Sequence, residues 1–155
     1  MLKYSFILLM FLASCTEKGK IFDQMKEISP NGWTYNQIPE FPVQIDNNKL
    51  TYDIYLKLRV QKSYKYENLY LLSHIREPGG RIQTRQIDIT LTDDLGRPLG
   101  NTSGDAIDYE VPMYKQLHLK NIGQYTIALE QNLRDSVLTG VESIGIKVKE
   151  GVPVF

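Results

Sequence analysis

The chain has 155 residues, and its 18 basic and 18 acidic side chains give a formal net charge of zero. This balance argues against a nucleic-acid-binding protein and against a polybasic membrane-surface protein. The single cysteine, Cys15, excludes an intrachain disulfide. The fold must therefore be stabilised by packing alone.

The N-terminal residues carry the pattern of a lipoprotein signal. Lys3 precedes an apolar run from Phe6 to Leu12, which is well short of the ~20 residues that cross a bilayer. The run ends in Leu-Ala-Ser-Cys, which has the aliphatic, small, small, cysteine order of a lipobox. We predict a signal peptide at residues 1–14 and acylation of Cys15, which anchors the mature protein in a lipid bilayer. A buried core helix is the alternative for the apolar run.

Residues 15–32 are predicted to form a lipidated tether that precedes a globular domain at residues 33–155. The stretch is polar at its start and ends in a cluster of turn formers, as in a flexible stalk. Phe22, Met25 and Ile28 recur at three-residue spacing, so the alternative is a helical turn or two that docks on the domain.

Period-two alternation predicts the first strands of this domain. Residues 41–45 fit an edge strand, because Pro42 has no backbone donor for a second neighbour. The even-numbered residues of 50–60 are apolar and the odd-numbered ones are mostly polar, which predicts a half-buried strand with the even positions facing the core. Residues 66–75 carry apolar side chains on both faces and are predicted to form a central strand that is covered on both sides.

The second half of the chain continues the pattern. Further strands are predicted around residues 87–91, 107–113, 125–129 and 144–148, with turn formers between them. Residues 132–138 are short and mixed, and we expect one or two helical turns there. About seven or eight strands with little helix predict an all-β fold, an antiparallel two-sheet β-sandwich of jelly-roll-like form.

Few residues indicate catalytic chemistry. His74 and His118 are the only histidines, and neither has a second histidine or a carboxylate at ligand spacing. No metalloprotease, nucleophile-elbow or phosphate-loop motif is present, and acylation of Cys15 would remove the only thiol. We therefore predict a protein that is not an enzyme and holds no metal and no cofactor.

Two groups of carboxylates leave alternatives open. The first group is Asp93, Asp94, Asp105 and Asp108. Loop carboxylates of this kind could hold Ca²⁺, although aspartate is also common in turns for its own hydrogen bonding. The second group is Asp88 and Glu110, which would need a defined separation to act as the acid/base pair of a glycosidase.

The tyrosines are the more suggestive feature, since half of the ten lie between residues 52 and 70. An exposed aromatic ring beside charged groups suits a protein interface or a sugar-stacking surface. Packing within the sheet is the alternative, and Tyr52 shares the apolar face of its strand. The candidate interaction surface consists of Trp33, Tyr55, Lys57, Arg59, Tyr64 and Tyr66.

Several short segments along the chain are similar in sequence to segments of a known protein family. They are the lipobox, Trp33, Phe41–Asp46, Tyr52–Ile54, Leu58–Arg59, Tyr64–Leu69, Gly123–Tyr125, Gln131–Arg134 and Ile144–Ile146. Together they cover nearly the whole chain and resemble the GldH gliding-motility lipoproteins of Bacteroidetes. One departure is Leu99 before Gly100, where a tryptophan is expected.

The resemblance implies a lipoprotein of the cell envelope that is needed for surface gliding and is linked to type IX secretion. The expected function is a non-catalytic accessory subunit of that apparatus, with envelope proteins as partners and no nucleic acid. The alternative is a glycan- or peptidoglycan-binding lipoprotein that uses exposed tyrosines. Thr16 follows Cys15, and Lys18 and Lys20 offset the nearby Glu17, so neither an inner-membrane signal nor an acid-rich surface-export signal is present. We expect the outer membrane, with the domain facing the periplasm.

Overall fold

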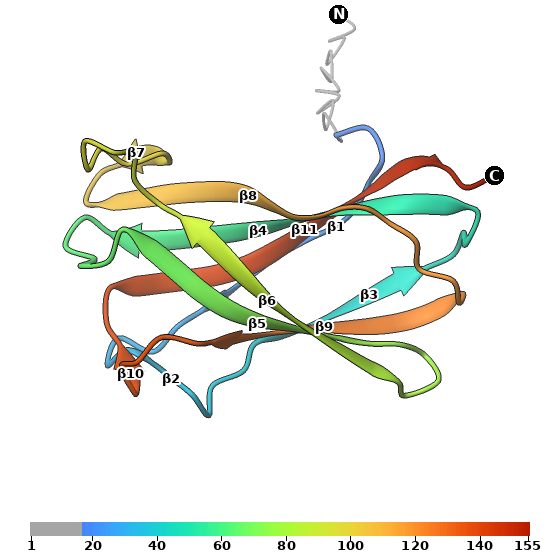
Figure 1. The fold of residues 1–155 in the computed structure, drawn as a ribbon, viewed down its shortest axis with the longest axis horizontal. Coiled ribbons are helices and arrows are strands. Elements are labelled where there is room, and N and C mark those ends of the chain that lie inside the picture. Colours follow the sequence, from blue (N-terminus) through green and yellow to red (C-terminus); the bar gives the residue numbers. More distant parts are fainter. Residues whose placement is uncertain (1–16) are drawn as a thin grey trace, which may run out of the picture.

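The computed structural model describes residues 17–155, which fold into two stacked antiparallel sheets and one short two-stranded sheet (Figure 1). The five-stranded sheet contains, in spatial order, β1 (Lys20–Glu27), β11 (Val141–Pro153), β4 (Leu50–Gln61), β8 (Ala106–Leu117) and β7 (Asn101–Ser103). The four-stranded sheet contains β3 (Glu40–Ile45), β9 (Gly123–Gln131), β5 (Asn68–Arg76) and β6 (Ile82–Thr90). The short sheet pairs β2 (Trp33–Thr34) with β10 (Val137–Leu138).

The predicted all-β sandwich is confirmed. The strands of the four-stranded sheet run obliquely across those of the five-stranded sheet (Figure 1). Residues 17–155 form eleven strands rather than seven or eight, because β2, β7 and β10 are too short to produce an alternation and β1 has no regular alternation. Within residues 17–155 no helix is long and apolar enough to cross a membrane.

The core lies between the two large sheets, and the alternation of the strands explains how it forms. In β4 the side chains of Tyr52, Ile54, Leu56, Leu58 and Val60 are all 1% exposed or less. The odd-numbered side chains of β4 point mainly to the outer face, so the predicted register is confirmed. Burial of these apolar side chains is the main force that holds the sheets together.

Strand β5 differs in part from its prediction. It is central, with β9 on one side and β6 on the other. Leu69 and Leu71 are fully buried, but Tyr70 and Leu72 are only half-buried because no further layer covers the outer face of this sheet. The prediction of cover on both sides is therefore wrong. At the far edge of the same sheet, β3 carries an exposed Pro42, which confirms the predicted edge strand.

The predicted tether is shorter than expected. Residues 20–27 form β1, which pairs along its length with β11 at the edge of the five-stranded sheet. Phe22 packs on the core with its ring edge-on to Phe41, and the centroids lie 6.5 Å apart. The helical alternative for this segment is wrong, because long-range pairing with β11 decides its structure. The signal peptide and Cys15 lie outside the described residues.

Residues 132–138 also differ from their prediction. They form a loop that ends in β10 instead of a helical turn. The side chain of Gln131, only 1% exposed, accepts a hydrogen bond from the backbone N–H of Leu133 (3.0 Å) and donates one to the carbonyl of Asp135 (2.9 Å). These two bonds satisfy backbone groups that a helix would have satisfied internally.

Candidate interaction site

The predicted interaction surface does not form one patch. Trp33 lies in the core with no exposed area, and its indole N–H donates a hydrogen bond to the carbonyl of Gln37 (2.6 Å). It therefore cannot contact a partner, and its place in the predicted surface is wrong. The remaining residues divide between two separate regions, one on each side of the sandwich.

The first region, which we call the charged face, is the outer face of the five-stranded sheet. Lys57 on β4 forms an ion pair with Asp23 on β1 at 2.6 Å. Arg59 donates to both carboxylate oxygens of Asp108 (2.8 and 2.7 Å) and to Glu142 (3.0 Å). Burial opposes ionisation of Asp23, but the hydrogen bond from Lys57 holds the pKa of that carboxyl below its ordinary value. Acidic side chains on the same face of this sheet, from β1, β8 and β11, thus engage Lys57 and Arg59.

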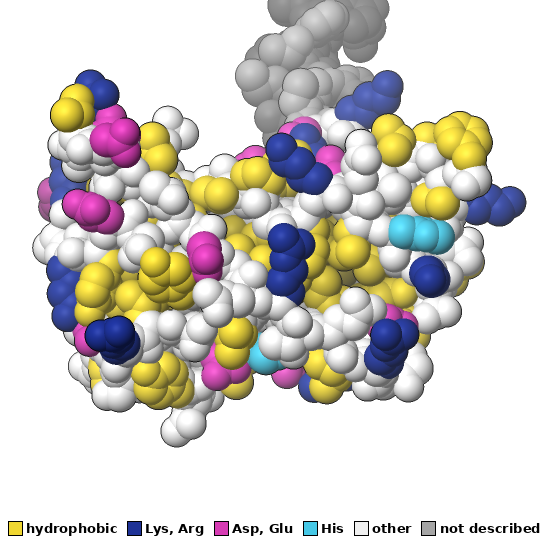
Figure 2. Space-filling view, viewed as in Figure 1, with side chains coloured by type: hydrophobic (Ala, Val, Ile, Leu, Met, Phe, Trp, Pro, Cys, Tyr) yellow, Lys and Arg dark blue, Asp and Glu magenta, His cyan; other side chains and the backbone are white. Residues whose placement is uncertain are grey.

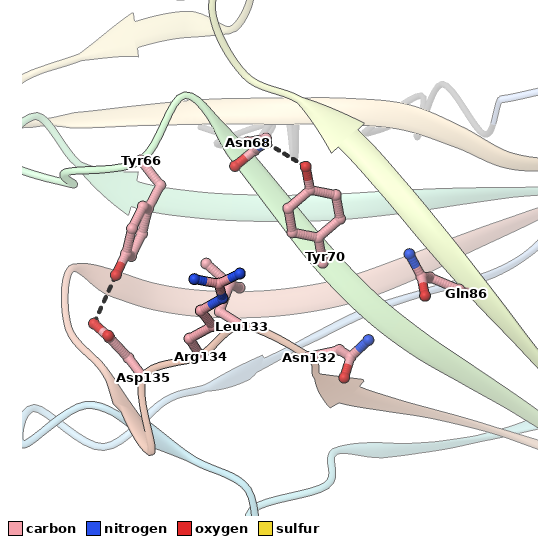
Figure 3. A pocket seen from close by; sticks show the side chains of 8 residues that line it. All are labelled: Tyr66, Asn68, Tyr70, Gln86, Asn132, Leu133, Arg134 and Asp135. Atoms are coloured by element: carbon pink, nitrogen blue, oxygen red, sulfur yellow. Dashed lines mark hydrogen bonds between the residues drawn. The ribbon is translucent and has the colours of Figure 1, made fainter.

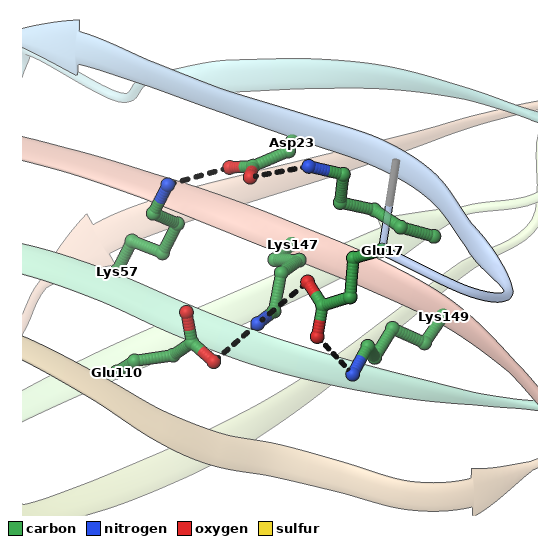
Figure 4. Close-up of polar contacts among 7 residues, drawn as sticks. Glu17, Asp23, Lys57, Glu110, Lys147 and Lys149 are labelled. Atoms are coloured by element: carbon green, nitrogen blue, oxygen red, sulfur yellow. Dashed lines mark hydrogen bonds and ion pairs between the residues drawn. The ribbon is translucent and has the colours of Figure 1, made fainter. Parts of the chain in front are cut away.

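At the centre of the charged face is Lys147 on β11, whose side chain is only 8% exposed. Its Nζ bonds Glu110 on β8 and lies 3.4 Å from Glu17 (Figure 4). The same Nζ lies 5.2 Å from the centre of the Tyr55 ring. Burial opposes the charged form, yet the hydrogen bond to Glu110 raises the pKa of Lys147 above its ordinary value. Glu17 also pairs with Lys149, so the start of the described chain is held on this face.

The second region is a pocket on the opposite side of the molecule, which we call the tyrosine pocket. Its volume is about 490 Å³. Its lining consists of Tyr66, Asn68, Tyr70, Gln86, Asn132, Leu133, Arg134 and Asp135 (Figure 3). Tyr70 and Gln86 stand on the outer face of β5 and β6, because their neighbours Leu71 and Ile87 point into the core.

The predicted tyrosines contribute unequally to this pocket. Tyr64 is partly buried against the core, and burial raises the pKa of its phenol. Its ring packs edge-on against the ring of Tyr66, with centroids 5.8 Å apart, so Tyr64 contacts a residue of the pocket lining without lining the pocket itself. Tyr66 does line the pocket, and its hydroxyl donates to Asp135 at 2.8 Å. Of the six predicted surface residues, only Tyr66 lies in this site.

Sequence reasoning missed the other lining residues. The sequence predicts a strand covered on both faces for the segment with Tyr70, and one or two helical turns for residues 132–138. A clue was present, since Asn132, Arg134 and Asp135 form a polar run directly after an alternating strand. What the sequence does not show is that this loop lies against the start of β5, where the backbone N–H of Asn132 donates to the carbonyl of Tyr70 (2.9 Å).

The predicted carboxylate groups do not assemble. Asp93 caps its own turn by accepting from the backbone of Leu95 and Arg97, and these bonds, with the backbone N–H of Arg97 foremost, lower the pKa of Asp93. Asp108 is engaged by Arg59. No group of three or more histidine, aspartate and glutamate side chains that could hold a metal ion occurs in residues 17–155, so the structure gives the calcium alternative no support.

The proposed glycosidase pair and the histidines are also separated. Asp88 lies on the outer face of the four-stranded sheet and Glu110 on that of the five-stranded sheet, so the sandwich stands between them. His74 is held between Thr84 and Glu130, each 2.9 Å away. His118 bonds the carbonyl of Asn48 at 3.0 Å. Both histidines therefore have structural partners.

Charges are dispersed over the visible surface. Figure 2 shows basic and acidic side chains interspersed among hydrophobic patches on this face, with no large region of one sign. This distribution agrees with the zero net charge of the chain and gives this face no extended basic surface of the kind that binds nucleic acids.

The fold and its two surface regions define a class of protein, a compact β-sandwich that carries a paired-charge face on one sheet and a polar, aromatic-walled pocket on the other. The family model described as GldH lipoprotein matches residues 20–148, which is the whole sandwich except its last strand end. The chain belongs to the GldH lipoprotein family. Membership places it among the lipid-anchored proteins of the cell envelope that are named for gliding motility.

Two curated relatives extend the match to nearly the full chain. A gliding motility lipoprotein GldH homolog of Christiangramia forsetii is 24% identical over 95% of this chain and 94% of its own length. The gliding motility lipoprotein GldH of Flavobacterium johnsoniae is 24% identical over 96% of this chain and 98% of its own length.

Among solved structures, the sandwich is similar to a carbohydrate-binding module, CBM28, that is specific for non-crystalline cellulose. The match covers 81% of this chain and 73% of that chain, with 10% identity and a TM-score of 0.47. A TM-score at this level supports no conclusion about function.

Proposed function

We propose that the protein is a non-catalytic accessory subunit of the gliding-motility and type IX secretion apparatus. The observation that carries the proposal is the family match, which spans the sandwich from β1 into β11 and is supported by two relatives that align over nearly their full length. The protein binds other envelope proteins of that machinery and acts on no substrate.

The anchor of this subunit is the acylated Cys15 in the bilayer of the outer membrane, with the domain on the periplasmic side. The arrangement of the charged face supports a location near the membrane. Glu17 is held by Lys147 and Lys149, two residues after the cysteine. Because Glu17 is held so close in sequence to the lipidated residue, the domain lies near the membrane surface, where it can contact other envelope proteins of that membrane.

Crosslinking in intact cells tests the accessory role. The tagged lipoprotein is crosslinked in the envelope of its host and purified, and components of the motility and secretion apparatus are expected at fixed stoichiometry. A Cys15→Ala form is the matched control. It should not recover these components, because the unlipidated precursor no longer reaches the outer membrane. Recovery of saccharide without any component of that machinery would contradict the proposal.

Protease treatment tests the location. The domain is expected to resist protease on intact cells and to be digested once the outer membrane is permeabilised. Digestion on intact cells would place the domain on the cell surface and favour the glycan-binding alternative. One observation, the tyrosine pocket, favours that alternative as a second candidate function.

A further inference from the structure

We propose that the tyrosine pocket is a binding site for a saccharide that carries a carboxylate group. The inference goes beyond the accessory role and does not depend on it, since the pocket lies on the sheet opposite the charged face that holds the N-terminal segment. Its volume of about 490 Å³ falls within the range of sites that bind small ligands.

Tyr70 offers the pocket a free aromatic ring. Its hydroxyl accepts a hydrogen bond from the side-chain amide of Asn68 at 2.7 Å, which fixes the direction of the ring (Figure 3). Within residues 17–155 no aromatic or cationic side chain stacks on it, whereas the ring of Tyr66 contacts Tyr64 and Lys65. The electron-rich face of a phenol ring attracts the weakly positive C–H groups on one side of a pyranose.

The amides around this ring suit sugar hydroxyls. Asn132 makes no side-chain hydrogen bond within the described chain, and its amide points into the pocket from the loop (Figure 3). Gln86 donates its N–H to Asp88 at 2.9 Å and keeps its carbonyl oxygen for a ligand. An amide presents both donors and acceptors, and a sugar hydroxyl both donates and accepts, so the two groups are complementary.

Two charged side chains line the pocket, and only one of them is engaged. Asp135 accepts a hydrogen bond from the hydroxyl of Tyr66 at 2.8 Å and forms an ion pair with Lys65 at 2.7 Å. The hydrogen bond from Lys65 and, to a smaller extent, that from Tyr66 keep the pKa of Asp135 below its ordinary value. Arg134 has no ion pair and no side-chain hydrogen bond among residues 17–155. Its guanidinium faces the space between the two tyrosines (Figure 3). A planar guanidinium binds a carboxylate through two parallel hydrogen bonds, which is why the expected saccharide is acidic.

The backbone on each side of Arg134 is already fixed. The carbonyl of Leu133 accepts from the hydroxyl of Tyr35 at 2.5 Å, and the carbonyl of Asp135 accepts from the buried Gln131 at 2.9 Å. The backbone of the loop is therefore already ordered on each side of Arg134. A loop that is ordered before binding lowers the entropic cost of binding.

Titration calorimetry on the purified full-length lipoprotein in detergent tests the site. The probes are trisaccharides of galacturonate, glucuronate, mannuronate and guluronate, together with the methyl esters of the same four sugars. At least one acid is expected to bind, and its methyl ester about tenfold more weakly, because a charge-assisted hydrogen-bond pair is lost. Failure of all four acids to bind, or equal binding of an acid and its ester, would overturn the proposal.

Matched variants locate the binding on the protein. Arg134→Gln should weaken binding of the acid about tenfold and leave the weak binding of the ester unchanged, whereas Arg134→Lys should retain part of the affinity. Tyr70→Ala should weaken both probes, and Tyr70→Phe should weaken neither strongly, since the ring makes the contact. Arg97→Gln, on an exposed turn where the arginine pairs with Asp93, is the control. Unchanged affinity in Arg134→Gln would overturn the assignment.

These outcomes are independent of the accessory role. Loss of saccharide binding in Arg134→Gln with normal recovery of the motility proteins would support the pocket and leave the proposed function intact. Loss of those proteins in Cys15→Ala with normal saccharide binding would support both. Thermal unfolding of each variant verifies that the fold is kept.

Discussion

The ammonium of Lys147 lies 3.4 Å from a carboxylate oxygen of Glu17, although 130 residues separate the two in sequence. Through this contact the last strand of the sandwich holds the segment that follows the predicted lipid anchor. Glu110 completes the arrangement from β8, so one lysine joins three parts of the chain.

Loss of the Glu110 carboxylate should destabilise the protein. Glu110→Gln leaves Lys147 with a weaker partner in a site where its side chain is only 8% exposed, and the free energy of unfolding should fall by about 1–2 kcal/mol. Lys147→Met removes the buried charge itself and should cost less, since the methionine fills the same space. Urea denaturation measures both. A larger loss in Lys147→Met would show that the ion pair is net stabilising.

Gly145 is expected to control the attachment of β1. A Cβ on this residue would collide with the carbonyl oxygen of Gln24 and with Met25 in the paired strand. Gly145→Ala should therefore separate β1 from β11, and the amides of residues 20–27 should exchange with deuterium much faster. Gly79→Ala is the control, because a Cβ there meets no atom within 4 Å. Protected β1 amides in Gly145→Ala would contradict the pairing.

The register of β4 predicts effects of very different size for two adjacent residues. Leu56→Ala opens a cavity at a fully buried position and should lower the free energy of unfolding by about 2–5 kcal/mol. Lys57→Ala removes a partly exposed ion pair with Asp23 and should cost less than about 1 kcal/mol. Denaturant midpoints of the two variants provide the comparison. Similar losses would mean that the even-numbered face is not the core face.

Buried tyrosines should make the fold sensitive to alkali. Burial raises the pKa of Tyr52, Tyr64, Tyr109 and Tyr125 above the ordinary value of about 10. Their contribution to stability is complete below pH 10 and is lost as the pH rises through the folded-state values, because the unfolded chain releases these protons first. Each such group lowers the free energy of unfolding by about 1.4 kcal/mol per pH unit in that window.

Absorbance near 295 nm measures this titration. The four buried tyrosines should ionise only as the protein unfolds. Tyr64→Phe should reduce the slope of stability against pH in the same range. Ionisation of these four phenols at their ordinary value, with the fold intact, is the opposite result.

Cys15 is predicted to be the acylated first residue of the mature protein. Mass spectrometry of the purified lipoprotein should show the loss of residues 1–14 and the added mass of the acyl chains. Cys15→Ala should leave an unprocessed precursor with Met1 intact. A wild-type protein with an intact Met1, or one that is fully soluble without detergent, would be incompatible with the prediction.

Local alternation predicted much of the fold. The core positions of β4, the edge position of β3 with Pro42 and the antiparallel sandwich were all predictable, because each depends on a period-two pattern that a half-buried strand must have. The pattern failed at β1, where Ile21 and Met25 are exposed and burial does not alternate regularly. Pairing with a distant partner, β11, determines the structure there.

The candidate site was less predictable for a related reason. Trp33 is grouped with the predicted surface because it lies just upstream of the tyrosine cluster, and the local sequence does not show that it is fully buried in the core. Tyr66, one of the predicted surface residues, lines the pocket, but Tyr70 and Arg134 come together only when the loop after β9 folds back against β5. No spacing within one segment encodes that approach. The linear sequence also does not indicate that Gln131 is buried and that its side-chain amide hydrogen-bonds the backbone of this loop.

The attachment of Glu17 to Lys147 and Lys149 also sets the reach of the domain. Only Thr16 separates Glu17 from Cys15, and two residue steps span at most ~7 Å. With Cys15 acylated as proposed, the β1 side of the sandwich rests at the level of the lipid headgroups and cannot swing outward on a stalk. A partner must then present its own binding surface at the plane of the membrane, and lateral diffusion within that plane governs how often the two meet.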